Sequence, residues 1–423
     1  MKKRTTFLFA FIAAAGAASA FTVTGVSAHQ RWPWNNLIDI DFNIGGAAAD
    51  ETFKIDVKAT YANGSQTLVA KHFVTDPVVK GGDNRITWDI GLDCPNFKAD
   101  DLRVAVTATP FTNGTDGAWM IIDLSGGKDA TSYPVRYTTT APVHTPKAKD
   151  ICKTTQLWLK RIKGGSFMFC KGDASTGYFR VNLTKDYYMG IFECTQQQWA
   201  QVTGTWPSAF SNETWRATRP CDSIGISDVF GHNSWPANQV PGSSSFVAKM
   251  RSRSGLSSFN LQTESQWEWA SRCGYSKIRH PSYSYDQIRY NGSSNIDRAC
   301  SPDDGGTACV GTYVANPWGL YDIFGNANEM CLDAGCSETN LRLYYGSLMG
   351  LTEDESTYDK VEIDNPIGGP RTGAYAPSKT SYHIYRGGSW ANSSGTLTSI
   401  KRWENPDNVN VAQRGARFVV TCE

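Results

Sequence analysis

The sequence predicts an α+β protein in which an N-terminal all-β sandwich precedes a larger, loop-rich domain. Short segments of alternating apolar and polar residues, separated by glycine and asparagine turns, fill the first 145 residues and favour strands with one buried face. Beyond them, helix-start patterns at Thr195 and Thr263 add helices to strands. The 423 residues include 39 glycines and 14 tryptophans but only 19% charged residues, which is typical of a loop-rich fold closed by aromatic packing.

Residues 1–28 are typical of a secretory signal peptide. Three basic residues at positions 2–4 precede an apolar run over residues 7–18, and cleavage is expected after Ala20 or Ala28. The run is too short to span a membrane, and no later segment offers ~20 uninterrupted apolar residues. We therefore expect an exported protein without a membrane span, which is periplasmic, on the cell surface or secreted.

The charge balance argues against a nucleic-acid partner. The 41 basic and 40 acidic residues leave a formal net charge of +1, and no lysine or arginine run stands out. The sequence also contains neither Cys-x-x-Cys nor His-Glu-x-x-His, so zinc has no support.

The 11 cysteines all follow the expected signal peptide and fit an oxidising compartment, so we predict disulfide bonds. Their odd number leaves at least one unpaired or bonded to another chain. Cys300 and Cys309 flank one turn, and Cys331 and Cys336 flank another, so each couple could close a small loop. The connectivity stays open, because sequence alone does not determine it.

Residues 29–145 form the predicted β-sandwich domain. Residues 37–42, 53–57 and 102–106 alternate like half-buried strands, and turn signals at 62–65 and 80–84 separate them. No residues with catalytic chemistry converge there, so we expect a spacer or a surface for carbohydrate or protein. Residues 146–156, at the end of a threonine- and proline-rich stretch, are predicted to be a linker.

The second domain is predicted over residues 157–423. It opens with a strand that runs into Gly164 and Gly165. Thr195 with Gln198, and Thr263 with Gln266, have the spacing of capping boxes and predict two helix starts. The helix after Thr263 carries its apolar side chains on one face, so it is interpreted as a core helix with no active role for its glutamates.

The turn over residues 316–330 concentrates oxygen ligands. Asp322 and Glu329 supply carboxylates seven positions apart, and Gly325 lets the chain fold back so that carbonyls can point inward with them. This ligand set suits calcium. In the alternative interpretation, the carboxylates are turn acceptors beside core side chains.

Residues 316–329, Asn-Pro-Trp-Gly-Leu-Tyr-Asp-Ile-Phe-Gly-Asn-Ala-Asn-Glu, resemble the central signature of the formylglycine-generating enzyme, or sulfatase-modifying factor, family. Further similar segments occur in order at 187–199, 261–272, 385–390 and 415–418, so the resemblance covers about residues 157–420. It implies a scaffold related to C-type-lectin folds. It also implies a structural calcium held by the side chains of Asp322 and Glu329 and by the carbonyls of Gly325 and Ala327. Asn328 and Met330 stand where members carry tryptophans.

The resemblance also bears on catalysis. Active members hold copper with two cysteines, three and eight residues after the serine of the Arg-Gly-Gly-Ser motif. Counting from Ser389, these positions are Asn392 and Leu397. Because Cu(I) demands soft thiolates, we expect neither copper nor catalytic residues, and we take Ser389 and Asn392 as candidate binding residues. Residues 291–294 lie where the family carries a further cation site.

Three functions remain open from the sequence. The first is a catalytically silent pseudoenzyme that binds extracytoplasmic protein, peptide or glycan. The second is an active formylglycine-generating oxidase whose thiols come from elsewhere, with Cys331, Cys336 or Cys422 as candidates. The third is another hydrolytic or metal-dependent activity, for which no residues converge.

Overall fold

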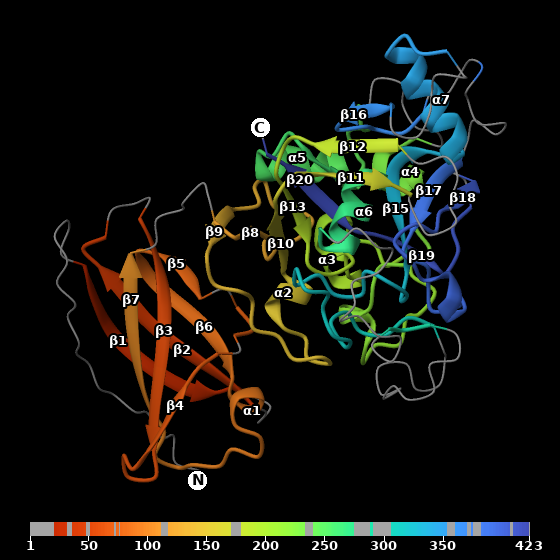
Figure 1. Ribbon diagram of the computed structural model, residues 1–423. Helices are drawn as coiled ribbons and strands as arrows, with labels where there is room; N and C mark the ends of the chain where they lie inside the picture. The colour runs from red at the N-terminus through yellow and green to blue at the C-terminus, as the bar shows by residue number, and fades with distance from the viewer. Residues whose placement is uncertain are drawn as a thin grey trace. The chain divides into compact units, whose positions relative to one another are not determined.

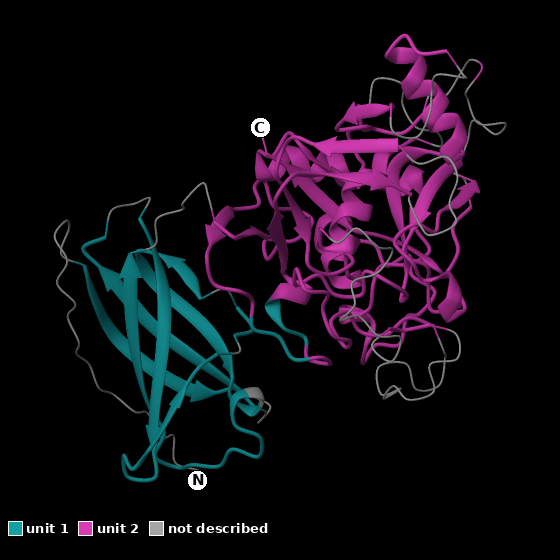
Figure 2. Ribbon diagram, viewed as in Figure 1, with its two compact units in different colours: residues 1–114, 143–145, 149–151 teal, residues 115–142, 146–148, 152–423 magenta. Residues whose placement is uncertain are grey.

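The chain divides into two compact units (Figures 1 and 2). Unit 1 comprises residues 1–114, 143–145 and 149–151, and unit 2 comprises residues 115–142, 146–148 and 152–423. The computed structural model describes residues 21–31, 36–47, 51–71, 73–75, 77–110, 117–170, 179–232, 240–274, 288–290, 306–352, 360–369, 374, 382–406 and 409–422. No helix within these ranges is long and apolar enough to cross a membrane.

Unit 1 is the predicted β-sandwich. One sheet has the order β1 (Thr22–Gln30), β2 (Leu37–Gly45) and β6 (Gly82–Asp89). The other has the order β4 (Gln66–Val69), β3 (Thr52–Tyr61) and β5 (Val78–Lys80), with β7 (Arg103–Pro110) also pairing with β3. All these pairings are antiparallel, and a short helix α1 (Ile90–Asp93) follows β6.

Alternation along the strands builds the core of unit 1. In β3, the side chains of Phe53, Ile55 and Val57 are buried while the residues between them are exposed. They join Ile40 of β2 and Trp88 of β6 in one hydrophobic cluster, as the inner faces of two sandwiched sheets do. The strands predicted at 37–42, 53–57 and 102–106 are thus confirmed, each within one residue at its start.

β1 bears on the expected signal peptide. Residues 1–20 lie outside the described residues, and β1 starts at Thr22, two residues after Ala20. Cleavage after Ala20 leaves this strand whole, whereas cleavage after Ala28 removes most of it. The signal peptide and both cleavage positions stay predictions.

The boundary predicted at residue 145 differs from the division in the structure. β8 (Trp119–Asp123) and β9 (Val135–Thr138) belong to unit 2, where β8 pairs with β10 (Gln156–Ile162). The predicted linker also differs, because α2 (Ile151–Thr154) lies within it and Cys152, Lys153 and Gln156 are buried. Alternation within a strand reveals its buried face but not the sheet that it joins.

The described residues of unit 2 form three sheets, whose strands are labelled in Figure 1. The largest has the order β14 (Phe259–Leu261), β20 (Phe418–Thr421), β13 (Tyr187–Gly190), β10, β8 and β9. A second has the order β11 (Gly165–Phe169), β12 (Phe179–Leu183) and β16 (Glu362–Asp364). The third has the order β18 (Trp403–Pro406), β17 (Tyr382–Arg386), β15 (Asn328–Ala334) and β19 (Arg414–Ala416).

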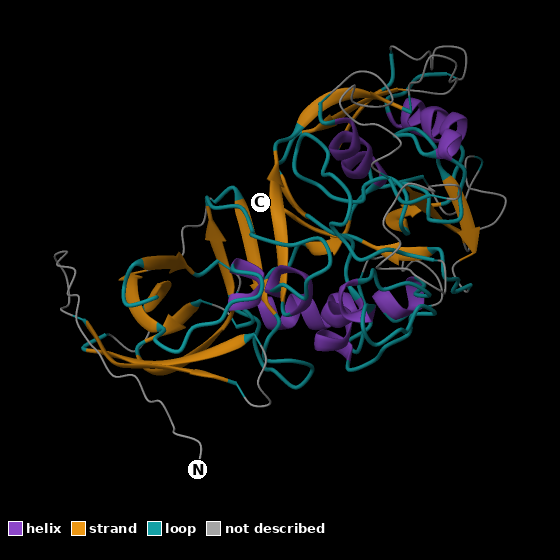
Figure 3. Cartoon of the chain, turned by 90° about the horizontal axis from the view of Figure 1, so that it is seen from below, coloured by secondary structure: helices purple, strands orange, loops and turns teal. Residues whose placement is uncertain are grey.

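Helices accompany these sheets, as Figure 3 shows by colour. They are α3 (Gln196–Thr203), α4 (Ile226–Phe230), α5 (Phe246–Ser254), α6 (Glu264–Arg272), α7 (Glu338–Leu348) and the 3₁₀ turns η1 (Arg216–Thr218) and η4 (Ser394–Thr396). Both predicted capping boxes are confirmed. The Thr195 hydroxyl accepts from the Gln198 backbone N–H at 3.1 Å, and Thr263 accepts from that of Gln266 at 3.2 Å.

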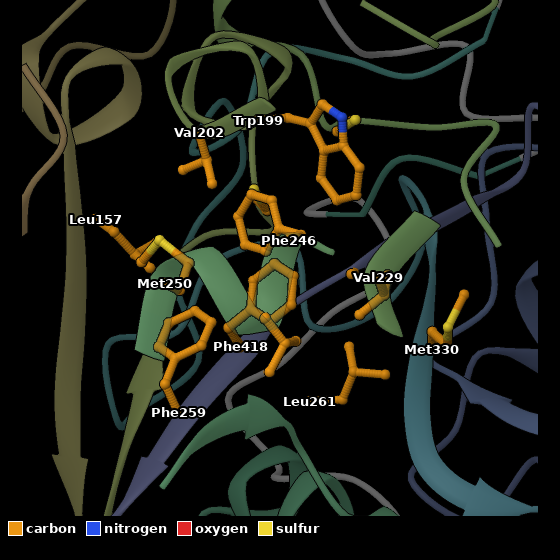
Figure 4. Close-up of a cluster of buried hydrophobic side chains, with 14 of the residues drawn as sticks. Leu157, Trp199, Val202, Val229, Phe246, Met250, Phe259, Leu261, Met330 and Phe418 are labelled. Carbon is orange, nitrogen blue, oxygen red and sulfur yellow. The ribbon is translucent and has the colours of Figure 1, made fainter. Parts of the chain in front are cut away.

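A stack of aromatic rings forms the centre of one core of unit 2 (Figure 4). Phe246 of α5 stacks on Trp199 of α3, with ring centroids 4.6 Å apart, and on Phe418 of β20, with centroids 4.7 Å apart. Met330 of β15 lies in the same cluster. This core therefore fixes the strand that carries Glu329. Sheets and helices occur together throughout unit 2, which confirms the α+β fold class.

Candidate functional site

The turn predicted to bind calcium is built by its own polar groups. The Asn316 side-chain carbonyl accepts from the backbone N–H groups of Trp318 and Leu320, at 3.1 and 3.0 Å. Asp322 and Gly325 both have positive φ, at 54° and 79°. A Cβ on Gly325 would lie 2.2 Å from the carbonyl oxygen of Arg289, so only glycine fits there.

Three buried carboxylates meet next to this turn. Asp322 precedes β15 and Glu329 lies in it, while Glu193 follows β13. All three are at most 2% exposed. Glu193 accepts from the Ala327 backbone N–H at 2.7 Å and from the Asn326 side-chain amide at 2.6 Å. A residue distant along the chain therefore stabilises the turn.

Glu329 is hydrogen-bonded on both oxygens. Its Oε1 accepts from Nε and Nη2 of Arg417, at 2.8 and 2.5 Å. Its Oε2 accepts from the indole N–H of Trp267 at 2.9 Å and from the side-chain amide of Gln262 at 3.3 Å. Because a carboxylate offers about four lone pairs, these four bonds occupy its accepting capacity.

Asp322 has spare capacity. Its Oδ2 accepts from the Gly311 backbone N–H at 2.7 Å, but Oδ1 is buried with no hydrogen-bond partner among the described residues. Burial raises the pKa of Asp322 to about 6. Burial and the charges of Asp322 and Glu329 raise the pKa of Glu193 well above its usual range. The cluster therefore favours a proton or a cation beside Asp322.

The predicted calcium ligands thus differ in how well they fit the ion. Asp322 Oδ1 is available, whereas Glu329 would have to release the longest of its bonds, from Gln262, to bind a cation. No group of three or more His, Cys, Asp or Glu side chains within the described ranges is arranged to hold a metal. A site with only two carboxylates and the carbonyls of Gly325 and Ala327 is compatible with that finding.

Ser389 and Asn392 lie together in a turn beside this cluster. The Asn392 side-chain oxygen accepts from the Ser389 backbone N–H at 2.8 Å and from the Ser389 hydroxyl at 2.9 Å. Ser389 is 1% exposed. This turn is hydrogen-bonded to the turn over residues 316–330. The Trp390 backbone N–H donates to the Asn326 carbonyl, and the Gly325 N–H donates to the Gly387 carbonyl. The Ser389 hydroxyl and the Asn392 side-chain oxygen are therefore hydrogen-bonded to each other within the turn.

The second position expected for a copper cysteine is apolar core. Leu397 is fully buried in a hydrophobic cluster with Trp267 and Ile323. Its Cδ2 would lie 2.3 Å from a Cβ on Gly388, so the glycine pair of the motif and this leucine are packed together. The environment of Leu397 is that of a core residue.

A buried ion network holds the Arg-Gly-Gly-Ser turn in place. Arg386 of β17 donates to Glu268 of α6, which also accepts from Arg272 at 2.6 Å. Arg402 donates to both oxygens of Glu264, the first residue of α6. Glu264 and Glu268 thus join α6 to the segments that carry Arg386 and Arg402.

Aromatic side chains border the Ser389 turn. Phe210 lies edge-on to Trp390 with ring centroids 5.5 Å apart, and the Arg219 guanidinium lies over the Phe210 ring, 4.8 Å from its centroid. Phe210 belongs to residues 204–215, between α3 and η1, which we term the aromatic loop. In the same loop, Trp206 is 37% exposed and carries Arg216 over its ring at 4.3 Å.

Sequence reasoning missed one carboxylate of the cluster, Glu193, and the arginine that binds Glu329, Arg417. Glu193 and Arg417 lie in segments that matched the family, but only as parts of a helix start and of a closing strand. Their spacing from Glu329 along the chain is too long for any local pattern to connect them. Residues 291–294, proposed as a further cation site, lie outside the described residues.

The described cysteines form no disulfide bond, and Cys300 lies outside the described residues, so the expected disulfides stay a prediction. Cys331 and Cys336 lie in the hydrophobic cluster that contains Trp267 and Leu397, and Cys422 packs against the cluster that contains Phe246 and Met330. Burial raises the pKa of Cys336 to about 11 and that of Cys331 well above its usual range. Such thiols do not readily supply the thiolates that copper requires.

Comparison with known proteins assigns residues 146–422 to a family. Residues 146–422 match the family described as Sulfatase-modifying factor enzyme 1-like domain. The chain is 26% identical over 206 residues to the chaperone protein LppX of Paenibacillus barcinonensis, covering 40% of this chain and 69% of that protein. It is 27% identical over 146 residues to the formylglycine-generating enzyme of Thermomonospora curvata, covering 32% and 41%. The solved structure of Treponema denticola variable protein 1 is 20% identical, with a TM-score of 0.44, and the match covers 66% of this chain and 99% of that one.

Proposed function

The chain belongs to the sulfatase-modifying factor enzyme 1-like domain family, and from this membership we propose that unit 2 is an exported binding module without oxidase activity. Its ligand is a protein, peptide or glycan outside the cytoplasm. The proposal rests on the two positions that carry copper thiolates in active members. In this chain they are Asn392, which is bonded to Ser389, and Leu397, which is buried in the core.

The surface beside the Ser389 turn is suited to a ligand. Trp390 and Phe210 are half-buried, and Trp206 exposes part of its ring beside the Arg216 guanidinium. Aromatic faces combined with a cation are typical of sites that bind sugars or peptide side chains. We propose that the ligand contacts the aromatic loop and Trp390.

Titration calorimetry with the full mature chain tests this proposal against panels of peptides and glycans. Saturable binding that Trp206→Ala weakens about tenfold or more supports it, because a well-packed aromatic contact contributes 1–2 kcal/mol or more. Leu348→Ala, which truncates a side chain 61% exposed on α7, is the control and should leave binding unchanged. An unchanged affinity in Trp206→Ala would show that the ligand does not bind at the aromatic loop.

The alternative function is a formylglycine-generating oxidase. The copper-loaded chain would be incubated with a cysteine-containing sulfatase-type peptide, and mass spectrometry would report aldehyde formation. We expect no aldehyde. Turnover that a cysteine substitution abolishes would replace the binding-module proposal with the oxidase.

We also propose a structural calcium at Asp322, Gly325, Ala327 and Glu329. Two observations support it: Asp322 Oδ1 is buried without a hydrogen-bond partner among the described residues, and the Glu329 carboxylate lies close enough to act on the charge of Asp322. Calcium should raise the melting temperature, chelator should lower it, and Asp322→Ala should abolish the difference. Gln262→Leu should strengthen the calcium effect, because it removes a donor that competes for Glu329. Asp129→Ala, an exposed acid elsewhere in unit 2, is the control, and an unchanged melt in chelator would remove the metal.

A further inference from the structure

Two buried cysteines face each other across a pair of extended segments. Thr195 and Pro220 form an antiparallel β-bridge, so the next residues outward, Cys194 and Cys221, are also directly opposite. The Cys221 backbone N–H donates to the Cys194 carbonyl at 2.7 Å, while the Cys194 N–H donates to the Ala416 carbonyl at 2.8 Å, so this pair makes one of the two backbone bonds of a regular hydrogen-bonded pair. Directly opposed residues in an antiparallel pair place their side chains on the same face.

The spacing of such a pair suits a covalent bond. Directly opposed residues of an antiparallel ladder have Cα atoms about 4.5–5.5 Å apart, which lies within the range of about 4.4–6.8 Å that disulfides usually span between Cα atoms. Both side chains are at most 1% exposed and lie in the same hydrophobic cluster. The described contacts of the two sulfurs are weak, at 3.8 Å to the Thr195 carbonyl and 3.9 Å to the Ser208 hydroxyl.

We propose that Cys194 and Cys221 form a disulfide bond in the exported protein, a pairing distinct from the two that sequence spacing suggested. Each thiol loses one proton and one electron. A small-molecule or protein disulfide accepts the two protons and two electrons and is reduced to two thiols. The reaction passes through a mixed disulfide, which the second thiolate resolves. The proposal shares only the assumption of export with the proposed function, because an oxidising compartment supplies the oxidant.

The bond forms during folding rather than afterwards. Burial raises the pKa of both thiols in the folded chain, so few thiolates are available once the core has closed. The same burial protects the finished disulfide from reductants.

The disulfide would close the segment that carries the candidate binding surface. The chain between the two cysteines contains α3, the aromatic loop and η1. Phe210 lies in this segment and packs on Trp390. The bond therefore pre-organises the aromatic loop, which is the part of the site with the most exposed residues.

Peptide mapping tests the proposal. The full mature chain is unfolded and reduced, refolded in a buffer of reduced and oxidised glutathione, alkylated in denaturant without reductant, and digested with trypsin. Peptides 186–216 and 217–249 should appear joined, about 2 Da lighter than the sum of the two free peptides. Refolding to the native circular dichroism spectrum with both cysteines alkylated, or with either linked to another cysteine, would overturn the assignment.

Two further measurements separate the disulfide from mere packing. Disulfide formation should raise the melting temperature by roughly 5–10 °C relative to the reduced chain and slow hydrogen exchange over residues 204–215. Cys194→Ala should abolish both differences, whereas Cys331→Ala, which removes another buried thiol, should retain them. Because neither measurement involves a ligand, its outcome is independent of the binding-module proposal.

Discussion

At the scale of single residues, charge is paired where solvent cannot reach it. The Arg417 guanidinium contacts the Glu329 carboxylate and also donates to the carbonyls of Gly190 and Tyr321, at 2.9 and 2.8 Å. Burial opposes its charge, yet the contact with Glu329 raises the pKa of Arg417. One side chain thus links β13, the turn before β15, β15 itself and the junction of β19 with β20.

Arg417→Met should destabilise unit 2 by about 3–5 kcal/mol, because it leaves the Glu329 charge buried without its partner. Chemical denaturation followed by circular dichroism measures the change. Lys128→Met, which breaks an exposed pair with Asp129, should cost at most about 1 kcal/mol. Equal costs for the two variants would contradict the pairing described for Glu329.

Asp333 makes stability depend on pH. Burial and the Glu264 charge raise its pKa to about 7, compared with about 3.9 in an unfolded chain. Between these values the native chain holds a proton that the unfolded chain has lost, so stability from this residue is present at low pH and falls as pH rises toward 7. Between pH 5 and 8, the fall in melting temperature should therefore be smaller in Asp333→Asn than in the wild type by roughly 3–6 °C. Asp129→Asn is the exposed control, and an unchanged pH profile in Asp333→Asn would refute the assignment.

At the scale of elements, turns rather than strands shape the candidate site. The turn at 316–328 depends on residues in the left-handed region, and the Arg-Gly-Gly-Ser turn places two further glycines there, with φ of 89° at Gly387 and 75° at Gly388. The two turns are hydrogen-bonded to each other. The positive-φ residues and the hydrogen bonds between the two turns therefore restrict the backbone of the site.

Gly325→Ala tests this rigidity. The new Cβ meets the Arg289 carbonyl and the backbone keeps its positive φ, so we expect a loss of stability of a few kcal/mol, about 2 or more, together with weaker calcium binding. Gly395→Ala is a matched control because nothing lies within 4 Å of its Cβ. Thermal melts with and without calcium measure both effects. A neutral Gly325→Ala would show that the turn tolerates another path.

At the scale of the whole molecule, the second unit begins earlier than its family match. β8 lies between β10 and β9 in the six-stranded sheet, and both β8 and β9 precede residue 146. Removing them would expose the edge of β10, with its unpaired backbone groups, to solvent and to other chains.

Two fragments make this testable. Residues 115–423 should fold alone and melt cooperatively, while residues 157–423, which lack β8 and β9, should aggregate. Size-exclusion chromatography and circular dichroism measure both. A monomeric, cooperative 157–423 fragment would show that the two strands are dispensable.

Local patterns were enough for the secondary structure that they describe. The capping boxes at Thr195 and Thr263 involve residues three apart, and strand alternation depends only on neighbours, so both were readable from the chain. Family motifs also located the turns at 322–329 and 386–392. In contrast, the role of Glu193 was not readable, because its partners Asn326 and Ala327 are more than 130 residues away.

The sequence by itself determined the fold class, the two capped helices and the family, and it has Asn392 and Leu397 where the family resemblance leads us to expect copper cysteines. Only the tertiary structure decided which sheet receives β8 and β9, which donors saturate Glu329, and which two cysteines face each other. The physical reason is the range of the interactions involved. Helix caps and strand faces depend on nearby residues, whereas buried charge pairs and strand pairing depend on segments that meet only after the chain has folded.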